Sequence, residues 1–275
     1  MRFSLCFLLA LTLLAQNPQQ KKRNPEAGDD VRGYTDTPVI PGQTWKVHDA
    51  ARPRPVKVAP GRPLVSLPAP GDAEILFDGG SLEKWQMKSR AGEFAPANWK
   101  VENGYVEIVS PQGMRWNMIT KEKYGDCQLH LEWMIPAEVN GKGQAGGNSG
   151  VELMSRYEVQ VLESYENVTY ADGQAASIYG QYPPLVNVSP KKGEWNSYDI
   201  FFEAPKFEGE KLVKPAVVTV VHNGVLVQHH KEILGPAAHR RTGVYKAHGE
   251  EPLSLQDHGH PVRYRNIWVR RLKGE

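Results

Sequence analysis

The stretch VVTVVHNGVLVQHH, residues 217–230, decides the fold class. Two short apolar and β-branched runs, Val217–Val221 and Leu226–His230, flank Asn223-Gly224. Asn-Gly supplies the positive φ angles that a two-residue type I′ turn requires, so this stretch predicts a β-hairpin.

The same texture of short strands and turns recurs from Gly71 to the end of the chain. A second Asn-Gly turn, Asn103-Gly104, joins the runs Trp99–Val101 and Tyr105–Val109. In Asp126–Ile135 apolar residues alternate with His130 and Glu132, which is a period of two. Further strands are predicted at Glu74–Phe77, Val151–Leu153, Arg156–Leu162, Trp195–Glu203 and Tyr264–Leu272. Because sustained helical periodicity is absent, we predict an all-β sandwich of about 200 residues in one domain.

The first 70 residues differ from the rest. Residues 1–15 place Arg2 before the apolar run Phe3–Leu14 and a small residue, Ala15, which is the layout of a secretory signal peptide. The cleavage position is imperfect, so an uncleaved anchor stays open as an alternative. Residues 16–70 are proline-rich and predict an extended segment or linker, which Trp45 and Val47 could pin to the domain at 71–275.

The overall composition argues against a nucleic-acid partner and, once residues 1–15 are removed, against an internal disulfide. With 23% charged residues and a formal net charge of +2, the chain lacks the basic field of a nucleic-acid-binding protein. If residues 1–15 are removed, only Cys127 remains and no internal disulfide can form. We therefore expect a periplasmic or secreted protein with no stable membrane insertion after signal cleavage. The oligomeric state is left open.

The stretch RYEVQVLESYENVTYADGQAASIYGQYPP, residues 156–184, carries the strongest functional signal. Its strand sets Glu158 and Gln160 side by side on one face, which suits a wet concave surface. The loop that follows interleaves polar side chains with aromatic rings, a combination that suits a carbohydrate. The loop residues concerned are Asp172, Gln174, Tyr179, Gln181 and Tyr182. The alternative is an ordinary half-exposed strand followed by a surface loop.

Two other motifs could carry chemistry. The run Gln256-Asp257-His258-Gly259-His260 precedes the last strand, and His258 is a candidate general base that Asp257 could tune. His258 and His260 could also share a divalent cation, or His258 could be a loop histidine bonded to backbone. The glycines of G-x-G-x-x-G at residues 141–146 lie between strands, so they predict a rim loop rather than a dinucleotide site.

Carboxylates of a conventional glycosidase are not evident. Glu132 and Glu158 lie on the polar faces of two separate strands and would flank a glycosidic bond only if those strands were neighbours. Glu158 and Glu163 are spaced by an odd number of residues and face opposite ways unless a bulge intervenes.

Several strings, in this order, resemble the 3-keto-disaccharide hydrolase domain family. They are FDGGSLEKW (77–85), NWKVENGYV (98–106), KYGDCQLHLEW (123–133), GNSGV (147–151), RYEVQVLES (156–164), YADGQAASIYGQYPP (170–184), GEWNSYDI (193–200), HNGVLVQ (222–228) and LQDHGHPVRYRNIWVR (255–270). YTDTPVIPGQTWKVHDAARPRP (34–55) resembles an N-terminal extension found in part of that family.

The resemblance implies a concanavalin-like jelly roll that cleaves glycosides already oxidised to a ketone at carbon 3. The ketone acidifies the proton on carbon 2, so one base can start a β-elimination, and water can then add to give net hydrolysis. Cofactor dependence is unknown, and a divalent cation is possible. The alternative function is a non-catalytic carbohydrate-binding module of the same fold; a structural or adhesion domain is a weaker one.

Mapped onto this sequence, the resemblance implies His258 as base or acid, with Glu158 as its complement or as a metal ligand. Substrate contacts are assigned to Gln160, Glu132, Gln256, Asp257 and Arg265, with Tyr179, Tyr182 and Trp195 as stacking surfaces. The chain departs from the expected pattern at two positions, where Glu152 replaces an apolar residue and Glu163 replaces an aspartate. The first departure predicts an additional carboxylate in or beside the site.

Overall fold

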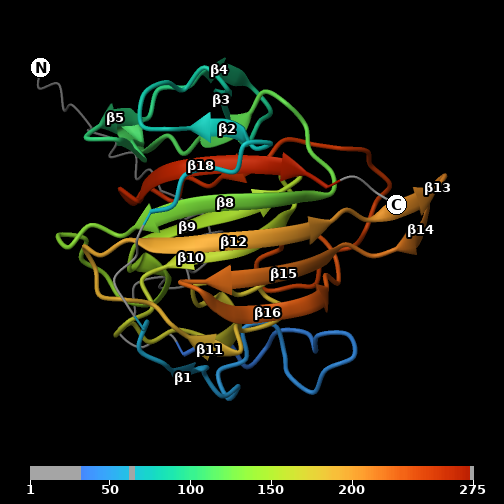
Figure 1. Cartoon of the computed structure of the whole chain (residues 1–275). Helices are drawn as coiled ribbons and strands as arrows, with labels where there is room; N and C mark the ends of the chain where they lie inside the picture. The colour runs from blue at the N-terminus through green and yellow to red at the C-terminus, as the bar shows by residue number, and fades with distance from the viewer. Residues whose placement is uncertain (1–31, 62–65, 273–275) are drawn as a thin grey trace, which may run out of the picture.

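Two antiparallel β-sheets pack face to face in the computed structural model, which describes residues 32–61 and 66–272 (Figure 1). The six-stranded sheet has the order β10-β9-β17-β7-β3-β4. Its strands are β3 (Trp85–Lys88), β4 (Phe94–Pro96), β7 (Asn117–Thr120), β9 (Asn148–Leu153), β10 (Tyr157–Leu162) and β17 (Ser254–Leu255). This sheet carries the site described below.

The eight-stranded sheet has the order β16-β15-β12-β8-β18-β6-β5, and β2 pairs with β18. Its strands are β2 (Glu74–Phe77), β5 (Lys100–Glu102), β6 (Tyr105–Glu107), β8 (Cys127–Met134), β12 (Asn196–Glu203), β15 (Val217–His222), β16 (Val225–Glu232) and β18 (Arg263–Arg271). Smaller elements are β13 (Lys206–Glu208), β14 (Lys211–Lys214) and the 3₁₀ turns η1 (Pro111–Gly113), η2 (Gly143–Ala145) and η3 (Ala171–Gly173).

Both predicted hairpins are confirmed. β15 pairs antiparallel with β16, and Asn223 and Gly224 between them have φ angles of 51° and 79°. β5 pairs with β6 around Asn103 and Gly104, where φ is 47° and 78°. Positive φ at both central positions is what a type I′ turn requires.

One hydrophobic core fills the space between the sheets. Leu129, Leu131 and Trp133 of β8 face Val159 and other apolar residues of β10 across this core. Side chains alternate along a strand, so Glu158 and Gln160 lie on the outer face of the six-stranded sheet and Glu132 on the outer face of the other sheet. The predicted all-β fold, a jelly-roll sandwich of two antiparallel sheets, is confirmed.

Four of the strands that sequence patterning missed lie in the six-stranded sheet. β3, β4, β7 and β17 have two to four residues each. A period of two cannot be recognised over so few residues. β17 is defined by its pairing with β7 and β9 from distant parts of the chain, whereas β4 pairs with β3 close to it in the chain.

The described part of the N-terminal segment wraps against the sandwich. Ile40 and Val47 are both 0% exposed, whereas Trp45 is only half-buried. Farther along, β1 (Val56–Lys57) pairs in parallel with β11 (Val186–Asn187) (Figure 1). The predicted signal peptide, residues 1–15, lies outside the described residues. In residues 32–61 and 66–272, no helix has both the length and the apolar character needed to cross a membrane.

Candidate functional site

A cavity of about 1060 Å³ opens on the outer face of the six-stranded sheet. Its floor comes from β9, β10 and β17. Glu158 of β10 pairs in register with Glu152 of β9, and Gln160 pairs with Gly150. Five of the predicted site residues line this cavity: Glu158, Gln160, Tyr179, Gln256 and His258. The extra carboxylate predicted at Glu152 lines it as well.

Gly150 lets two functional side chains meet at the centre of the floor. A Cβ atom at this position would lie 2.8 Å from Gln256 Oε1 and 2.8 Å from Glu158 Oε1. The backbone also brings β17 close, because Gln256 N donates to Gly150 O at 2.9 Å. Any larger residue would push Glu158 and Gln256 apart, so glycine is required here for packing.

A chain of hydrogen bonds connects His258 with Glu152 through Gln256. Gln256 Nε2 donates to Glu152 Oε1 at 2.9 Å, and His258 Nε2 lies 3.1 Å from Gln256 Oε1. Because the amide oxygen can only accept, His258 Nε2 carries the proton in this assignment and Nδ1 carries the lone pair. Nδ1 has no hydrogen-bond partner in the described ranges. In this tautomer the lone pair of His258 Nδ1 is available to accept a hydrogen bond or a proton.

Burial shifts the two titrating groups of the site in useful directions. Burial raises the pKa of Glu158 well above its usual value, the charge of Glu152 raises it further, and a hydrogen bond with Gln256 offsets part of the rise. Burial also lowers the pKa of His258 to about 4, helped by the positive charges of Arg115 and Arg90. Near neutral pH the imidazole of His258 is therefore neutral, while burial favours the protonated form of the Glu158 carboxyl group.

Amide side chains form the part of the cavity next to Gln160. Gln160 Nε2 donates to Gln144 Oε1 at 3.1 Å, and Asn148 Nδ2 donates to the same oxygen at 3.2 Å. Asn148 Oδ1 is buried and has no partner within residues 32–61 and 66–272. Gln144 belongs to the glycine-containing loop at 141–146, and Lys142 of this loop also lines the cavity. The loop is therefore a rim element, as predicted.

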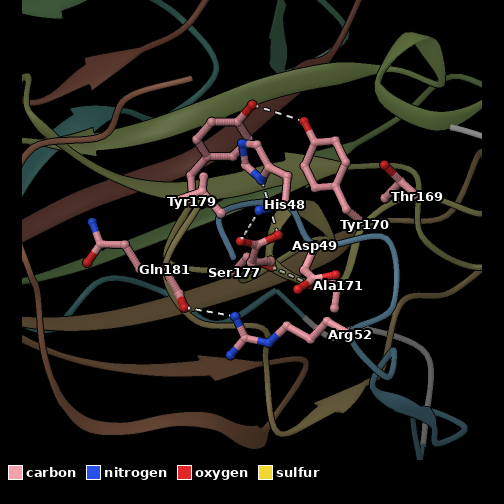
Figure 2. A network of polar contacts seen from close by, with 12 residues as sticks. His48, Asp49, Arg52, Thr169, Tyr170, Ala171, Ser177, Tyr179 and Gln181 are labelled. Carbon is pink, nitrogen blue, oxygen red and sulfur yellow. Dashed lines mark hydrogen bonds and ion pairs between the residues drawn. The ribbon is translucent and has the colours of Figure 1, made fainter. Parts of the chain in front are cut away.

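The loop after β10 contributes one aromatic wall, and its other polar residues anchor the N-terminal segment. Tyr179 OH lies 3.0 Å from Tyr170 OH, and both rings pack against His48 (Figure 2). Asp172 binds His48 Nδ1 at 3.1 Å, and both side chains are 0% exposed. Gln181 accepts from Arg52 through its backbone oxygen (Figure 2). The expectation that Asp172 and Gln181 bind sugar is therefore corrected: they hold chain segments together.

The structure also corrects the assignment of Glu132, Arg265 and Trp195 as substrate contacts. β8 and β18 belong to the eight-stranded sheet, so the outward residues of these strands point away from the cavity on the other side of the sandwich. There Arg265 Nε donates to Glu132 Oε2 at 2.6 Å. The Arg265 guanidinium lies 4.0 Å from the centre of the Trp195 ring. These three residues form a structural network.

Asp257 and Tyr182 do not line this cavity, although Asp257 lines a neighbouring pocket together with Glu152, Gln256 and His258. Asp257 is 3% exposed, and its Oδ1 accepts from Ser110 Oγ at 2.6 Å and from Gly259 N at 2.7 Å. This carboxylate therefore shapes the loop instead of tuning His258. Tyr182 packs against the core, with Lys231 Nζ at 4.9 Å from its ring centre. Glu163 accepts from Tyr165 N at 2.7 Å and closes a turn.

Sequence reasoning missed most of the cavity rim. The residues concerned are Tyr34, Asp36, Arg90, Arg115, His239 and Arg240. They come from loops and from the N-terminal segment, where no periodicity marks a face. His260, the second candidate metal ligand, accepts from Asn148 N through Nδ1 at 3.1 Å. In the part of the chain that the structure describes, no group of three or more His, Cys, Asp or Glu is arranged to hold a metal ion.

The chain is similar to known proteins in sequence and in fold. The family model for the 3-keto-alpha-glucoside-1,2-lyase-like domain matches residues 72–270. A crystal structure of a candidate glycosyl hydrolase from Parabacteroides distasonis is 42% identical, with a TM-score of 0.70, and the match covers 80% of this chain and 93% of that one. A second such structure from Parabacteroides distasonis is 18% identical over 73% of this chain and 94% of that one, with a TM-score of 0.51, and supports the fold alone. No curated protein matches the chain. This chain belongs to the 3-keto-alpha-glucoside-1,2-lyase-like family.

Proposed function

We propose that this protein is a glycoside-cleaving enzyme that acts on 3-keto-glycosides. The observation that carries the proposal is the combination, above one cavity floor, of a carboxyl group with a raised pKa and an imidazole with a lowered pKa. The family match and the candidate glycosyl hydrolase at 42% identity also support it. Titrating groups whose pKa values are strongly perturbed, and which lie together in a cleft, mark a candidate functional site.

In the proposed reaction His258 Nδ1 removes the proton from carbon 2 of the keto sugar. The electron pair of that C–H bond forms an enolate with the carbon 3 ketone. The enolate collapses to restore the ketone, a carbon 1–carbon 2 double bond forms, and the bond from carbon 1 to the leaving oxygen breaks. Water then adds across the new double bond, with its oxygen on carbon 1 and a proton on carbon 2, which gives net hydrolysis.

The remaining residues take supporting roles in this scheme. Glu158, whose protonated form is favoured by burial and by the charge of Glu152, donates its proton to the leaving oxygen. The positive charges of Arg90 and Arg115 stabilise the negative charge that develops on the enolate oxygen. Gln256 and Glu152 are positioning residues, because their hydrogen bonds fix the orientation of His258. Gln160 and Asn148 supply amide groups for the sugar hydroxyls. We also propose export to the periplasm or the medium, from the residue pattern at positions 1–15.

A test offers an aryl 3-keto-glucoside to the purified protein and follows aglycone release. We expect turnover by the wild type and a decrease of roughly 10²–10⁴-fold in kcat for His258→Ala, the range for loss of a general base. His229→Ala is the matched control, because His229 is exposed on β16 of the eight-stranded sheet, and its turnover should equal that of the wild type.

Two results would contradict the proposal in different ways. Full turnover by His258→Ala would remove His258 as the base while leaving the activity intact. No aglycone release by the wild type from several 3-keto-glycosides, together with measurable binding of the same sugars, would favour a carbohydrate-binding module.

A further inference from the structure

A second pocket, of about 260 Å³, lies beside the candidate active site. It shares Arg90, Glu152, Gln256 and His258 with the larger cavity, so a ligand bound over the catalytic floor can extend into it. We call this space the side pocket. The residues that line only the side pocket have no role in the reaction proposed above.

The register of the six-stranded sheet places the side pocket directly next to the catalytic floor. Ser254 of β17 pairs with Glu152 of β9 on one side and with Ile119 of β7 on the other. Lys88 of β3 pairs with Asn117 of β7. Paired residues, and residues two apart on one strand, project on the same side of a sheet, so Lys88 and Glu152 share the outer face. Only β7 separates β17 from β3, which sets these two strands about 9–10 Å apart.

The two carboxylates that face the side pocket are hydrogen-bonded within the chain. Glu152 Oε2 accepts from Ser254 Oγ at 2.6 Å, and Glu152 Oε1 accepts from Gln256 Nε2 at 2.9 Å. Asp257 is 3% exposed, its Oδ1 accepts from Ser110 Oγ at 2.6 Å, and its Oδ2 is closed off from solvent. Both carboxylates therefore stabilise the wall of the pocket.

The hydroxyl groups of the side pocket are likewise used within the chain. Ser155 Oγ donates to Pro252 O at 2.9 Å, and Ser89 Oγ donates to Glu93 Oε2 at 3.1 Å. These hydroxyl protons are therefore not directed at a ligand.

Lys88 and Arg90 differ from the rest of the lining. In residues 32–61 and 66–272 neither side chain makes a hydrogen bond or an ion pair. Lys88 is half-buried, and its Nζ lies 5.8 Å from the centre of the Phe94 ring. An ammonium group has three donors and no acceptor, and a carboxylate is its strongest partner. The spare hydrogen-bonding capacity of the side pocket is therefore cationic.

We propose that the side pocket binds the leaving group of the 3-keto-glycoside and that Lys88 binds a carboxylate on that leaving group. The inference rests on the proposed function, and it names glycosides of hydroxy acids as a substrate class. Because the lysine side chain extends from β3, one ring with the glycosidic oxygen at one end and a carboxylate at the other is long enough to join β17 to Lys88. Arg90 lies between the two spaces and adds positive charge to both.

The test compares two substrates with the full-length protein, the 3-keto-glucoside of 4-hydroxybenzoate and that of its methyl ester, which is neutral. For Lys88→Met, which keeps the length of the side chain, we expect KM for the acid to rise about five-fold at unchanged kcat, the upper end for a partly exposed ion pair. KM for the ester should change less than two-fold. Lys88→Arg keeps the charge and should retain most of the wild-type preference, whereas Lys88→Glu should raise KM for the acid further.

Lys211→Met is the matched control, because it removes the same charge from an exposed position on β14, outside the six-stranded sheet. It should change neither KM. An equal rise of KM on both substrates with Lys88→Met, or no rise on either, would overturn the carboxylate site and leave the proposed function standing.

Binding of the free hydroxy acid tests the side pocket without turnover. Calorimetric titration with 4-hydroxybenzoate should show binding that is about five-fold weaker in Lys88→Met than in the wild type. Equal affinity in the two proteins, or no binding to either, would overturn the carboxylate site. A wild type that cleaves neither 3-keto-glucoside but shows this difference in affinity would overturn the proposed function and leave the carboxylate site standing.

Discussion

Glu132 and Glu158 occupy equivalent positions in the two sheets and have opposite properties. Each lies on the outward face of an alternating strand, Glu132 in β8 and Glu158 in β10, and they are 0% and 5% exposed. Glu132 is covered on its outer side by the chain around Ser66, whereas Glu158 opens onto the cavity. The same local pattern therefore produces a structural ion pair on one side of the sandwich and a candidate acid on the other.

The two carboxyl groups differ in pKa because their neighbouring groups differ. Burial by itself would raise the pKa of both carboxyl groups. At Glu132, hydrogen bonds from Ser66, Asn266 and Arg265, together with the nearby His130 ring at 4.0 Å, outweigh burial and lower the pKa to about 2. At Glu158, burial dominates, the charge of Glu152 adds to it, and one hydrogen bond with Gln256 offsets only part of the rise. The chemical role of a carboxylate depends on the groups that surround it. The alternation of residues along a strand does not reveal those groups.

The largest expected difference between the two glutamates is the effect of a Glu→Gln substitution on kcat/KM. Glu158→Gln removes the proposed acid, and we expect kcat/KM on a 3-keto-disaccharide to fall roughly 10³-fold. Glu132→Gln should stay within about three-fold of the wild type, because its side chain lies on the other sheet and general acid–base effects need direct contact. Steady-state kinetics at pH 7 measures both.

Equal loss of activity in Glu132→Gln and Glu158→Gln would contradict the assignment of different roles to the two glutamates. That outcome would mean that Glu132 affects the site through the sandwich, or that Glu158 does not act as the acid. A leaving group that needs no protonation, such as a nitrophenolate, should restore much of the activity of Glu158→Gln and so sharpens the assignment.

The sequence was most informative where strands are long and their partners are nearby. The Asn-Gly hairpins and the alternation in β8 and β10 were predicted because backbone geometry and burial act within a few residues there. Glu158, Gln160 and His258 were placed in one cavity through family resemblance as much as through pattern. The rim was not predictable, because Tyr34 and Arg240 meet only through a buried anchor at His48 and Asp172, far apart in the chain.

Glu132 could not be distinguished from Glu158 before the sheet order was known. Both strands alternate, and the sequence does not state which of them pairs with β12 and β18 and which with β9. Two of the short strands of the six-stranded sheet, β7 and β17, were missed for a related reason, since they pair with each other from distant parts of the chain. β3 and β4 pair locally but are too short to show a period of two.

At pH 7 the two variants should differ in stability, with Glu132→Gln less stable than the wild type and Glu158→Gln at least as stable. Removing one partner of a fully buried ion pair costs ~3–5 kcal/mol; because the Arg265 side chain is 31% exposed, we expect Glu132→Gln to lower the free energy of unfolding by about 2 kcal/mol. The contribution of Glu132 is complete above the ordinary pKa of 4.5 and is lost as pH falls toward about 2. The difference between Glu132→Gln and the wild type should therefore shrink as the pH falls through this window. Urea unfolding at several pH values measures it.

Glu158 reverses this pH dependence. Its folded-state pKa is raised, so its contribution is fully present below the ordinary value of 4.5 and is lost as pH rises toward the folded-state value. Glu158→Gln cannot ionise, so at pH 7–8 it should be at least as stable as the wild type. A Glu158→Gln variant that is less stable than the wild type throughout pH 5–8 would show that the carboxyl group is stabilised as an anion, contrary to the acid role.

The smallest expected effect concerns Trp195, whose ring supports the Arg265 partner of Glu132. Trp195→Leu removes the cation–π contact at 4.0 Å and should lower the free energy of unfolding by roughly 0.5–1 kcal/mol. Trp195→Phe keeps a ring face and should recover part of this loss. Because the contact lies on the eight-stranded sheet, kcat/KM should equal that of the wild type in both variants. A ten-fold loss of kcat/KM at unchanged stability would instead return Trp195 to the role of a sugar-stacking residue.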